Sequence, residues 1–237
     1  MCTLSWLFFG GGYELHFNRD ESRARREAAP PRVVSGGDCS FVAPVDGEAG
    51  GTWIAVNAAG IGLALLNRYD REGRSGERSR GLLVAELASL GDLRHLGEAL
   101  GSERLERYAP FDLAVFHPAA GGLCWTWDGR RLSGRALIAA DLPLVSSGFD
   151  SRGVDRRRRE VFREVGEPTS ARLTALHRCH APEKGPYSVC MHRPDAATVS
   201  YTRVRVAGRR ARMEYIGGPP CRGGVPLCRE LVLGRGG

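Results

Sequence analysis

The first residues of the chain place a nucleophilic residue type near a block of charge. An apolar run, three consecutive glycines and a second apolar run lead from Cys2 to the charged block Arg19–Glu21. Two apolar runs that flank glycines are typical of a β-hairpin, because glycine readily adopts the positive φ of a tight loop. A loop centred on Gly11 predicts that Cys2 faces Asp20 across the hairpin. A slip of one residue would bring a neighbour of Asp20 there instead.

A cysteine in this position could act as a nucleophile that carries its own base. The thiolate is the reactive form of cysteine, so a catalytic cysteine needs a group that accepts its proton. If Met1 is removed, Cys2 gains an α-amine whose pKa of about 7.7–8.0 lies close to that of a thiol, about 8.5. Asp20 would then hold the amine in place. The alternative is that Cys2 is only a small strand residue near the end of the chain.

Other residues of reactive types lie in the C-terminal half of the chain. Five of them have side chains that bind metals in other proteins: His177, Cys179, His180, Cys190 and His192. No CxxC pair accompanies them and their spacing matches no zinc signature, so we expect core or surface roles and no metal site. Cys221 and Cys228 could form a disulfide, but the odd, scattered set of seven cysteines is typical of reduced thiols in the cytoplasm.

The charge of the chain could indicate nucleic-acid binding. The 237 residues carry a formal net charge of +7, almost all of it from arginine, since Lys184 is the one lysine. No recognition motif accompanies this charge, so we expect no nucleic-acid partner. We interpret the arginine-rich run Asp155–Glu160 as the solvated face of a helix. No apolar stretch approaches the roughly 20 residues that span a membrane, and no secretory signal is evident.

Strands open and close the chain, and helices are grouped between them. After the first hairpin, the pattern predicts a second hairpin with strands near 52–57 and 61–67, and a helix that Ser79 caps. Another helix begins at Asp92. Later segments comprise strands over "FDLAVFH", "GLCWTWDG" and "PLVSSG", helices near 153–165 and 170–178, and strands over "YSVCMH", "ATVSYTRVRV" and "RARMEYI". This grouping predicts an α+β fold with antiparallel sheets, in one domain over 1–237 with a Gly/Pro-rich tail over 217–237.

Five short motifs in order resemble a known family. They are "MCT" at the start, "NRDE" at 18–21, "GGTW" at 50–53, a strand that ends in Asn67, and "SRG" at 79–81. Together they resemble the NRDE family, also named for transport and Golgi organisation. That family looks like a branch of the N-terminal nucleophile hydrolases, and the resemblance implies a four-layer αββα sandwich. Its characterised relatives resemble conjugated bile acid hydrolases and penicillin V acylases.

The resemblance also implies roles for individual residues. Cys2 becomes the nucleophile, Asp20 the partner of its amine, and Asn67 a hydrogen-bond donor to the oxyanion. Arg19, inside the "NRDE" motif, is a further catalytic candidate. The relatives carry a second Asn where this chain has "VSSG", so Ser146 and Ser147 are candidates for substrate binding, together with Arg80 of the "SRG" motif.

Two functions of different classes follow. The first is an N-terminal cysteine amidohydrolase that needs no cofactor and acts on a linear, non-peptide C–N amide of a small molecule. The second is a non-catalytic protein that binds or carries an apolar ligand such as haem, because similar proteins have been linked to haem handling. A cysteine thiolate or a histidine such as His180 could ligate the haem iron. The cysteine, Asp20 and Asn67 favour the first; the missing second Asn favours the second.

Overall fold

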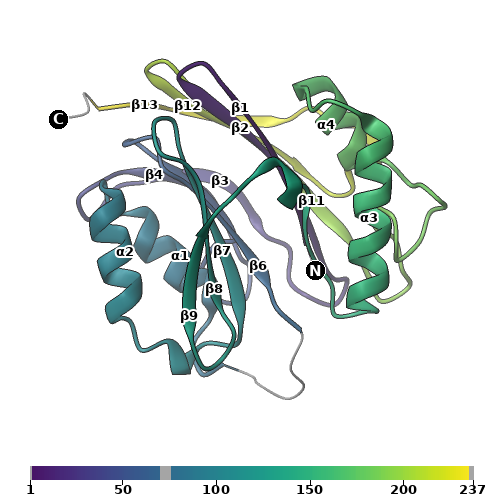
Figure 1. Ribbon diagram of the computed structural model, residues 1–237, viewed down its shortest axis with the longest axis horizontal. Helices are drawn as coiled ribbons and strands as arrows, with labels where there is room; N and C mark the ends of the chain where they lie inside the picture. The colour runs from purple at the N-terminus through teal and green to yellow at the C-terminus, as the bar shows by residue number, and fades with distance from the viewer. Residues whose placement is uncertain (1, 70–75, 235–237) are drawn as a thin grey trace.

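The computed structural model describes residues 2–69 and 76–234. Two antiparallel sheets lie face to face, with helices on the outer side of each sheet (Figure 1). One sheet has the strand order β10 (Leu144–Ser146), β1 (Cys2–Phe9), β2 (Gly12–Ser22), β11 (Ala196–Ala207), β12 (Arg210–Gly217) and β13 (Leu227–Val232). The other has the order β3 (Ala29–Val34), β4 (Phe41–Val45), β5 (Ile54–Asn57), β6 (Gly62–Asn67), β7 (Phe111–His117), β8 (Gly121–Trp127) and β9 (Leu132–Ala136).

The helices complete a four-layer αββα arrangement, as expected. Helices α1 (Arg80–Ala88) and α2 (Leu93–Ser102) lie on the sheet of β3–β9, and α3 (Ser151–Val165) and α4 (Ser170–Arg178) cover the sheet that contains β1 and β2 (Figure 1). Ser79 caps α1 and Asp92 caps α2 through side-chain oxygens that accept backbone N–H bonds. Within the described residues, three short 3-10 helices lie between these elements: η1 (Leu105–Arg107), η2 (Ala139–Asp141) and η3 (Pro220–Arg222).

Successive residues of β1 point to opposite faces of the sheet. Its side chains therefore alternate between the core between the two sheets and the layer of α3 and α4. Cys2, Leu4 and Trp6 belong to the apolar core between the two sheets. The intervening Thr3 and Ser5 are also buried, but they contact residues of α3 and α4 respectively. The nucleophile candidate therefore faces the interior of the sandwich, at one end of its strand.

The first hairpin forms as predicted, but its register differs by one residue. The loop is Gly10-Gly11, with Gly11 at a φ of 74°, and Phe9 pairs with Gly12. Gly12 itself belongs to β2, where an added Cβ would lie 2.2 Å from the carbonyl oxygen of Val206. The prediction that Cys2 faces Asp20 is therefore wrong. Cys2 faces Arg19, because the loop has two residues and not three.

Two further segments differ from the sequence interpretation. Arg158, inside the run Asp155–Glu160, is completely buried, so that run is not simply a solvated helix face. The segment "YSVCMH" is an irregular connection with an isolated bridge from His192 to Ala197. The Gly/Pro-rich tail ends in β13, an edge strand paired with β12, which agrees with the short apolar run in the sequence there.

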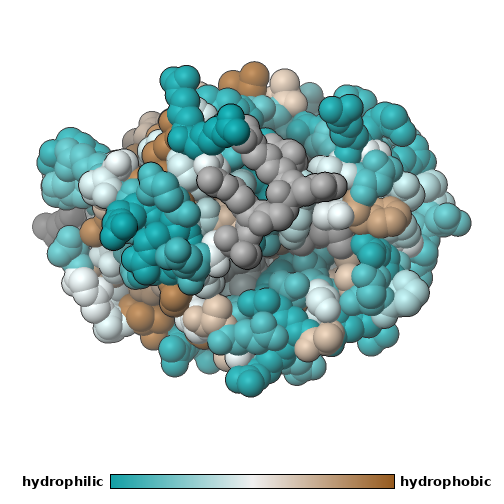
Figure 2. Space-filling model, turned by 90° about the horizontal axis from the view of Figure 1, so that it is seen from below, coloured by the Kyte–Doolittle hydropathy of each residue, from teal (hydrophilic) through white to brown (hydrophobic). Residues whose placement is uncertain are grey.

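The outer surface is polar, as expected when the apolar side chains are packed between the layers. The face shown in Figure 2 is mostly hydrophilic, and its apolar residues lie in small separate areas. Among the described residues, no helix combines the length and the apolar character needed to cross a membrane.

Candidate functional site

Cys2 lines a cavity of about 130 Å³ between the two sheets. All four predicted catalytic residues line it. The lining consists of Cys2, Arg19, Asp20, Glu21, Arg25, Asp46, Thr52, Trp53, Leu65, Asn67, Ser79, Arg80 and Gly81. All five sequence motifs therefore contribute to one cavity, although their residues are separated by up to about eighty positions in the chain.

Opposing effects act on the pKa of the Cys2 thiol. Burial raises the pKa of the Cys2 thiol, and the negative charge of Asp20 raises it further. The positive charge of Arg19 and a hydrogen bond from the Asp20 backbone act in the opposite direction. The thiol is thus protonated at rest, and a base must take its proton before it can attack a carbonyl carbon.

Arg19 is held on the same side of the sheet as Cys2. Its guanidinium lies 4.1 Å from the centre of the Trp53 ring and 2.5 Å from the carboxylate of Asp46. Burial alone would raise the pKa of Asp46, but hydrogen bonds from Arg25 and the Ala49 backbone, with the charges of both arginines, lower it to about 2. Asp46 is therefore ionised at neutral pH and keeps the Arg19 guanidinium beside Cys2.

Asp20 points to the opposite face of the sheet, toward α3. Its Oδ2 accepts hydrogen bonds from two guanidinium nitrogens of Arg158, each at 3.0 Å. Its Oδ1 accepts a hydrogen bond from Thr198 at 2.6 Å. The same Arg158 donates to the hydroxyl of Thr3, which follows the nucleophile in β1. Asp20 thus lies on the strand next to Cys2, with its carboxylate on the helix side.

Arg158 was missed by the sequence interpretation. A run of four arginines is usually a solvated helix face, and only one of the four can point inward at a given turn of α3. The helix places Arg158 in the same inward row as Val154 and Val161, at intervals of four and three residues. That i, i+4, i+7 spacing is the one signal that could have singled out Arg158.

The "GGTW" and "SRG" motifs position Arg80 by close backbone packing. A Cβ on Gly51 would lie 2.2 Å from the carbonyl carbon of Gly81. A side chain at Gly51 would therefore prevent the close approach of these two segments. The Thr52 N–H donates to the Gly81 carbonyl at 2.9 Å. This contact fixes the start of α1, and Arg80 reaches the cavity while one of its nitrogens donates to the Pro110 carbonyl. Burial lowers the pKa of Arg80 from its usual value.

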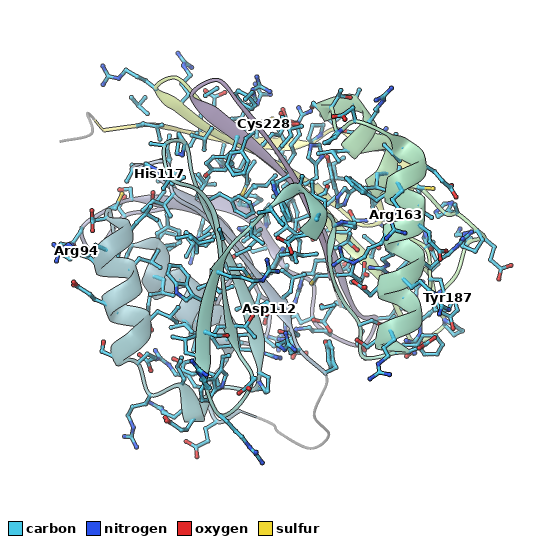
Figure 3. The ribbon with its side chains drawn as sticks, in the orientation of Figure 1. Arg94, Asp112, His117, Arg163, Tyr187 and Cys228 are labelled. Atoms are coloured by element: carbon cyan, nitrogen blue, oxygen red, sulfur yellow. The ribbon has the colours of Figure 1, made fainter. Side chains whose placement is uncertain are left out.

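Asn67 lies where this cavity adjoins a second one. It ends β6 and lines both the cavity at Cys2 and a neighbouring cavity of about 250 Å³. Its Nδ2 donates to the Tyr69 hydroxyl at 3.4 Å, a long hydrogen bond. Asp112 of β7 also lines the second cavity and is labelled near the middle of Figure 3.

The two serine candidates differ in what their hydroxyls do. Ser146 of β10 pairs directly with Cys2, and its Oγ is buried without a hydrogen-bond partner. The Ser147 hydroxyl donates to the Phe149 carbonyl at 2.5 Å and accepts from the Phe149 N–H. Both line the second cavity. Ser146 is therefore the better placed of the two to donate a hydrogen bond to a bound molecule.

The histidines considered as metal or haem ligands lie elsewhere. His177 of α4 is completely buried, and its Nε2 lies 2.8 Å from the Ser5 hydroxyl. His180 and His192 lie next to each other beyond the end of α4. The predicted removal of Met1 concerns a residue outside the described part of the chain.

Comparison of the sequence with protein families gives one match. The family model described as Transport and Golgi organisation 2 matches residues 11–131, just over half of the chain. The matched region contains Asp20, Asn67 and Arg80. No curated protein matches the chain in sequence.

Solved structures show that the fold is shared with acylases and amidases. The N-acylethanolamine-hydrolysing acid amidase orthologue of Caenorhabditis elegans superposes with a TM-score of 0.60 at 12% identity, covering 86% of this chain and 92% of that one. Penicillin V acylase from Agrobacterium tumefaciens gives 0.53 at 10% identity, covering 98% and 86%. A variant of the conjugated bile acid hydrolase from Clostridium perfringens gives 0.54 at 13% identity, covering 98% and 92%. At these identities the likeness establishes the fold, which is that of the N-terminal nucleophile hydrolases.

Proposed function

Because this chain belongs to the Transport and Golgi organisation 2 family and shares its fold with amide-cleaving acylases, we propose that it is an N-terminal cysteine amidohydrolase. Its substrate would be a linear, non-peptide C–N amide of a small molecule. The observation that carries the proposal is the position of Cys2, which lines one cavity together with Arg19, Asn67 and Arg80.

In the proposed reaction, Cys2 supplies both nucleophile and base once Met1 has been removed. The α-amine takes the thiol proton, and the sulfur attacks the amide carbonyl carbon to form a tetrahedral intermediate. The resulting ammonium then protonates the leaving nitrogen as the C–N bond breaks, which releases the amine and leaves a thioester on Cys2. Water attacks the thioester with the amine again as base, and the carboxylic acid product leaves with the thiol restored.

The neighbouring groups would each assist one part of this cycle. Asn67 Nδ2 would donate to the oxyanion, in place of its long bond to Tyr69. Ser146 lies opposite Cys2 in the strand pairing and its hydroxyl has no hydrogen-bond partner, so it would be the second donor. A positioned donor of this kind typically contributes about 10²–10³-fold in rate. Asp20, fixed by Arg158 and Thr198, would hold the end of β1 and the amine that it carries.

The cavities limit the substrate that we propose. Cavities of about 130 and 250 Å³ meet at Asn67, so the scissile amide would lie there, with one part of the substrate in each. Charged side chains of both signs line the two cavities, among them Arg80 and Asp46 in the smaller and Arg152 and Asp155 in the larger, which favours polar groups. We therefore propose a small polar amide rather than a long acyl chain.

This arrangement favours hydrolysis over the haem alternative. Haem presents a large apolar face, whereas charged and polar side chains make up most of the lining at Cys2. His177 is enclosed beside Ser5. Haem titration of the Cys2→Ala variant separates the two functions: a Soret shift that depends on Cys2 would support haem binding, and an unchanged shift would indicate adsorption elsewhere.

The experiment that tests the proposal uses protein with Cys2 at its N-terminus and a set of N-acyl aminocoumarin amides. We expect fluorescence release, and an acyl adduct on Cys2 in intact-mass and peptide spectra of acid-quenched samples. Cys2→Ala should abolish both, whereas Cys228→Ser, a change on the edge strand β13, should keep both. Equal hydrolysis by Cys2→Ala would contradict the proposal, as would an adduct confined to other cysteines.

A further inference from the structure

Four side chains of types that bind metals, from two segments of the chain, converge beyond the end of α4. They are His180, Cys190, His192 and Cys221, and their ligand atoms all lie within 4.8 Å of one another. Cys190 is completely buried and the other three are partly buried. His180 follows α4, Cys190 and His192 lie in the irregular connection to β11, and Cys221 lies in η3.

The three distances from His192 Nε2 to the other ligand atoms are close to those that a tetrahedral ion imposes. With Zn–S near 2.3 Å and Zn–N near 2.0–2.1 Å, tetrahedral angles separate two nitrogens by about 3.3 Å and a nitrogen from a sulfur by about 3.6 Å. The Nε2 atoms of His180 and His192 are 3.3 Å apart. The Nε2 of His192 lies 3.6 Å from the sulfur of Cys190 and 3.4 Å from that of Cys221.

We propose that His180, Cys190, His192 and Cys221 bind one zinc ion as a structural Cys₂His₂ site. Binding releases two protons, one from each thiol, and both imidazoles coordinate in the neutral form through Nε2. The two thiolates balance the two positive charges of the ion. With four protein ligands, no coordination position is left for a substrate, so the site is structural and not catalytic.

Geometry also favours metal binding over hydrogen bonding as the reason that these four side chains meet. Nε2 of His192 lies within 3.6 Å of three other ligand atoms at once, those of His180, Cys190 and Cys221. A neutral imidazole offers that nitrogen as a donor or as an acceptor, not both. The two rings are inclined at 68° and do not stack, and their Nε2 atoms lie 3.3 Å apart. One ion bound between the four ligand atoms would engage all of them.

The ion would link two connections of the chain that lie near the residues supporting Asp20. Cys221 belongs to the connection between β12 and β13, and the other three ligands belong to the connection between α4 and β11. Between Cys190 and His192, the Met191 N–H donates to Thr198 Oγ1 at 2.8 Å. The same hydroxyl donates to Asp20 at 2.6 Å. The zinc site would therefore stabilise the support of Asp20, and it holds whether or not Cys2 is a nucleophile.

The first test measures the metal in protein purified reduced and without chelators. We expect about one zinc per chain by elemental analysis. Replacement by Co²⁺ should give the ligand-field and thiolate charge-transfer absorption of a tetrahedral site with two thiolates. Cys221→Ser removes a ligand from a short surface segment, so this variant should fold and lose most of its zinc. His192→Ala should behave alike.

Cys228→Ser is the matched control, because Cys228 also lies near the C-terminus but outside the cluster, on β13 (Figure 3). It should keep both the zinc and the cobalt spectrum. A chelator should lower the melting temperature of the wild type and of Cys228→Ser, and should leave that of Cys221→Ser unchanged.

Three results would overturn the proposal. One is reduced, folded protein without zinc that also gives no thiolate-to-cobalt absorption. Another is zinc retained in the Cys190→Ser/Cys221→Ser double variant, which would show that the metal binds elsewhere. The third is a protein that, before any reduction, is lighter by two hydrogen masses and yields a Cys190–Cys221 disulfide peptide. None of these readouts depends on hydrolysis, so they distinguish this site from the proposed function.

Discussion

Arg158 and Asp20 form an ion pair that is completely enclosed by protein. Two guanidinium nitrogens lie 3.0 Å from the same carboxylate oxygen, and both side chains have an exposed fraction of 0%. Thr3 and Thr198 satisfy further groups of the pair. The pair joins α3 to β2 one residue beyond the position opposite Cys2, so it links the packing of a helix to the geometry of the candidate site.

The first prediction concerns the stability of this pair. Arg158→Ala leaves the Asp20 carboxylate buried and uncompensated, so we expect a loss of about 3–5 kcal/mol in the free energy of unfolding. Urea denaturation measures it. Arg156→Ala, in the same arginine run but exposed, should change stability by less than about 0.5 kcal/mol. Equal losses from both variants would show that the pair has no special role.

A second prediction uses the need for a free α-amine. The mature protein should lack Met1 by intact mass. A tag that cannot be removed should lower kcat by about 10²–10⁴-fold, because it converts the base into a non-basic amide. The same tag, cut so that Cys2 becomes the first residue, should restore full activity. If the permanently tagged protein is as active as the cut one, the amine is not the base.

The third prediction separates the oxyanion donors. Asn67→Ala should lower kcat by about 10²–10³-fold with little change in KM, because the donor acts on the transition state. Ser146→Ala should have a smaller effect of the same kind. Ser133→Ala, an exposed serine of β9, is the control and should be neutral. A change in KM alone for Asn67→Ala would indicate ground-state binding and not oxyanion stabilisation.

A fourth prediction follows from the low pKa of Asp46. Because the folded-state pKa of about 2 lies below the ordinary value of 3.8, the carboxylate stabilises the fold above about pH 4. This contribution is lost as the pH falls from about 4 to 2. The slope of unfolding free energy against pH in that window should be shallower in Asp46→Asn. Asp38→Asn, on an exposed turn, should keep the wild-type slope, and parallel slopes for all three proteins would refute the assignment.

Local sequence patterns predicted much of the fold. The apolar runs around Gly10–Gly12 indicated the first hairpin, and Ser79 and Asp92 indicated where helices begin. These signals act over a few residues, through the φ that glycine allows and the backbone N–H groups that a capping side chain satisfies. The motifs around Cys2, Asn67 and Arg80 also indicated residues that the structure brings to one cavity.

The hairpin register was not accessible from these patterns. Three consecutive glycines permit loops of two or three residues. The choice depends on packing across the sheet: Gly12 must enter β2 because Val206 of β11 approaches too closely for a side chain. That contact, between residues almost two hundred positions apart, places Arg19 rather than Asp20 opposite Cys2.

Tertiary structure likewise decided the roles of Arg158 and Cys221. The sequence interpretation put Arg158 on a solvated helix face and Cys221 in a Gly/Pro-rich tail, as a reduced thiol. Arg158 is buried because α3 turns it toward Asp20, and Cys221 meets two histidines because β12 carries η3 back beside the end of α4. Local propensity and spacing determine which elements form. Their packing determines which charged or metal-binding side chains meet, because those partners are distant in sequence and no short-range pattern relates them.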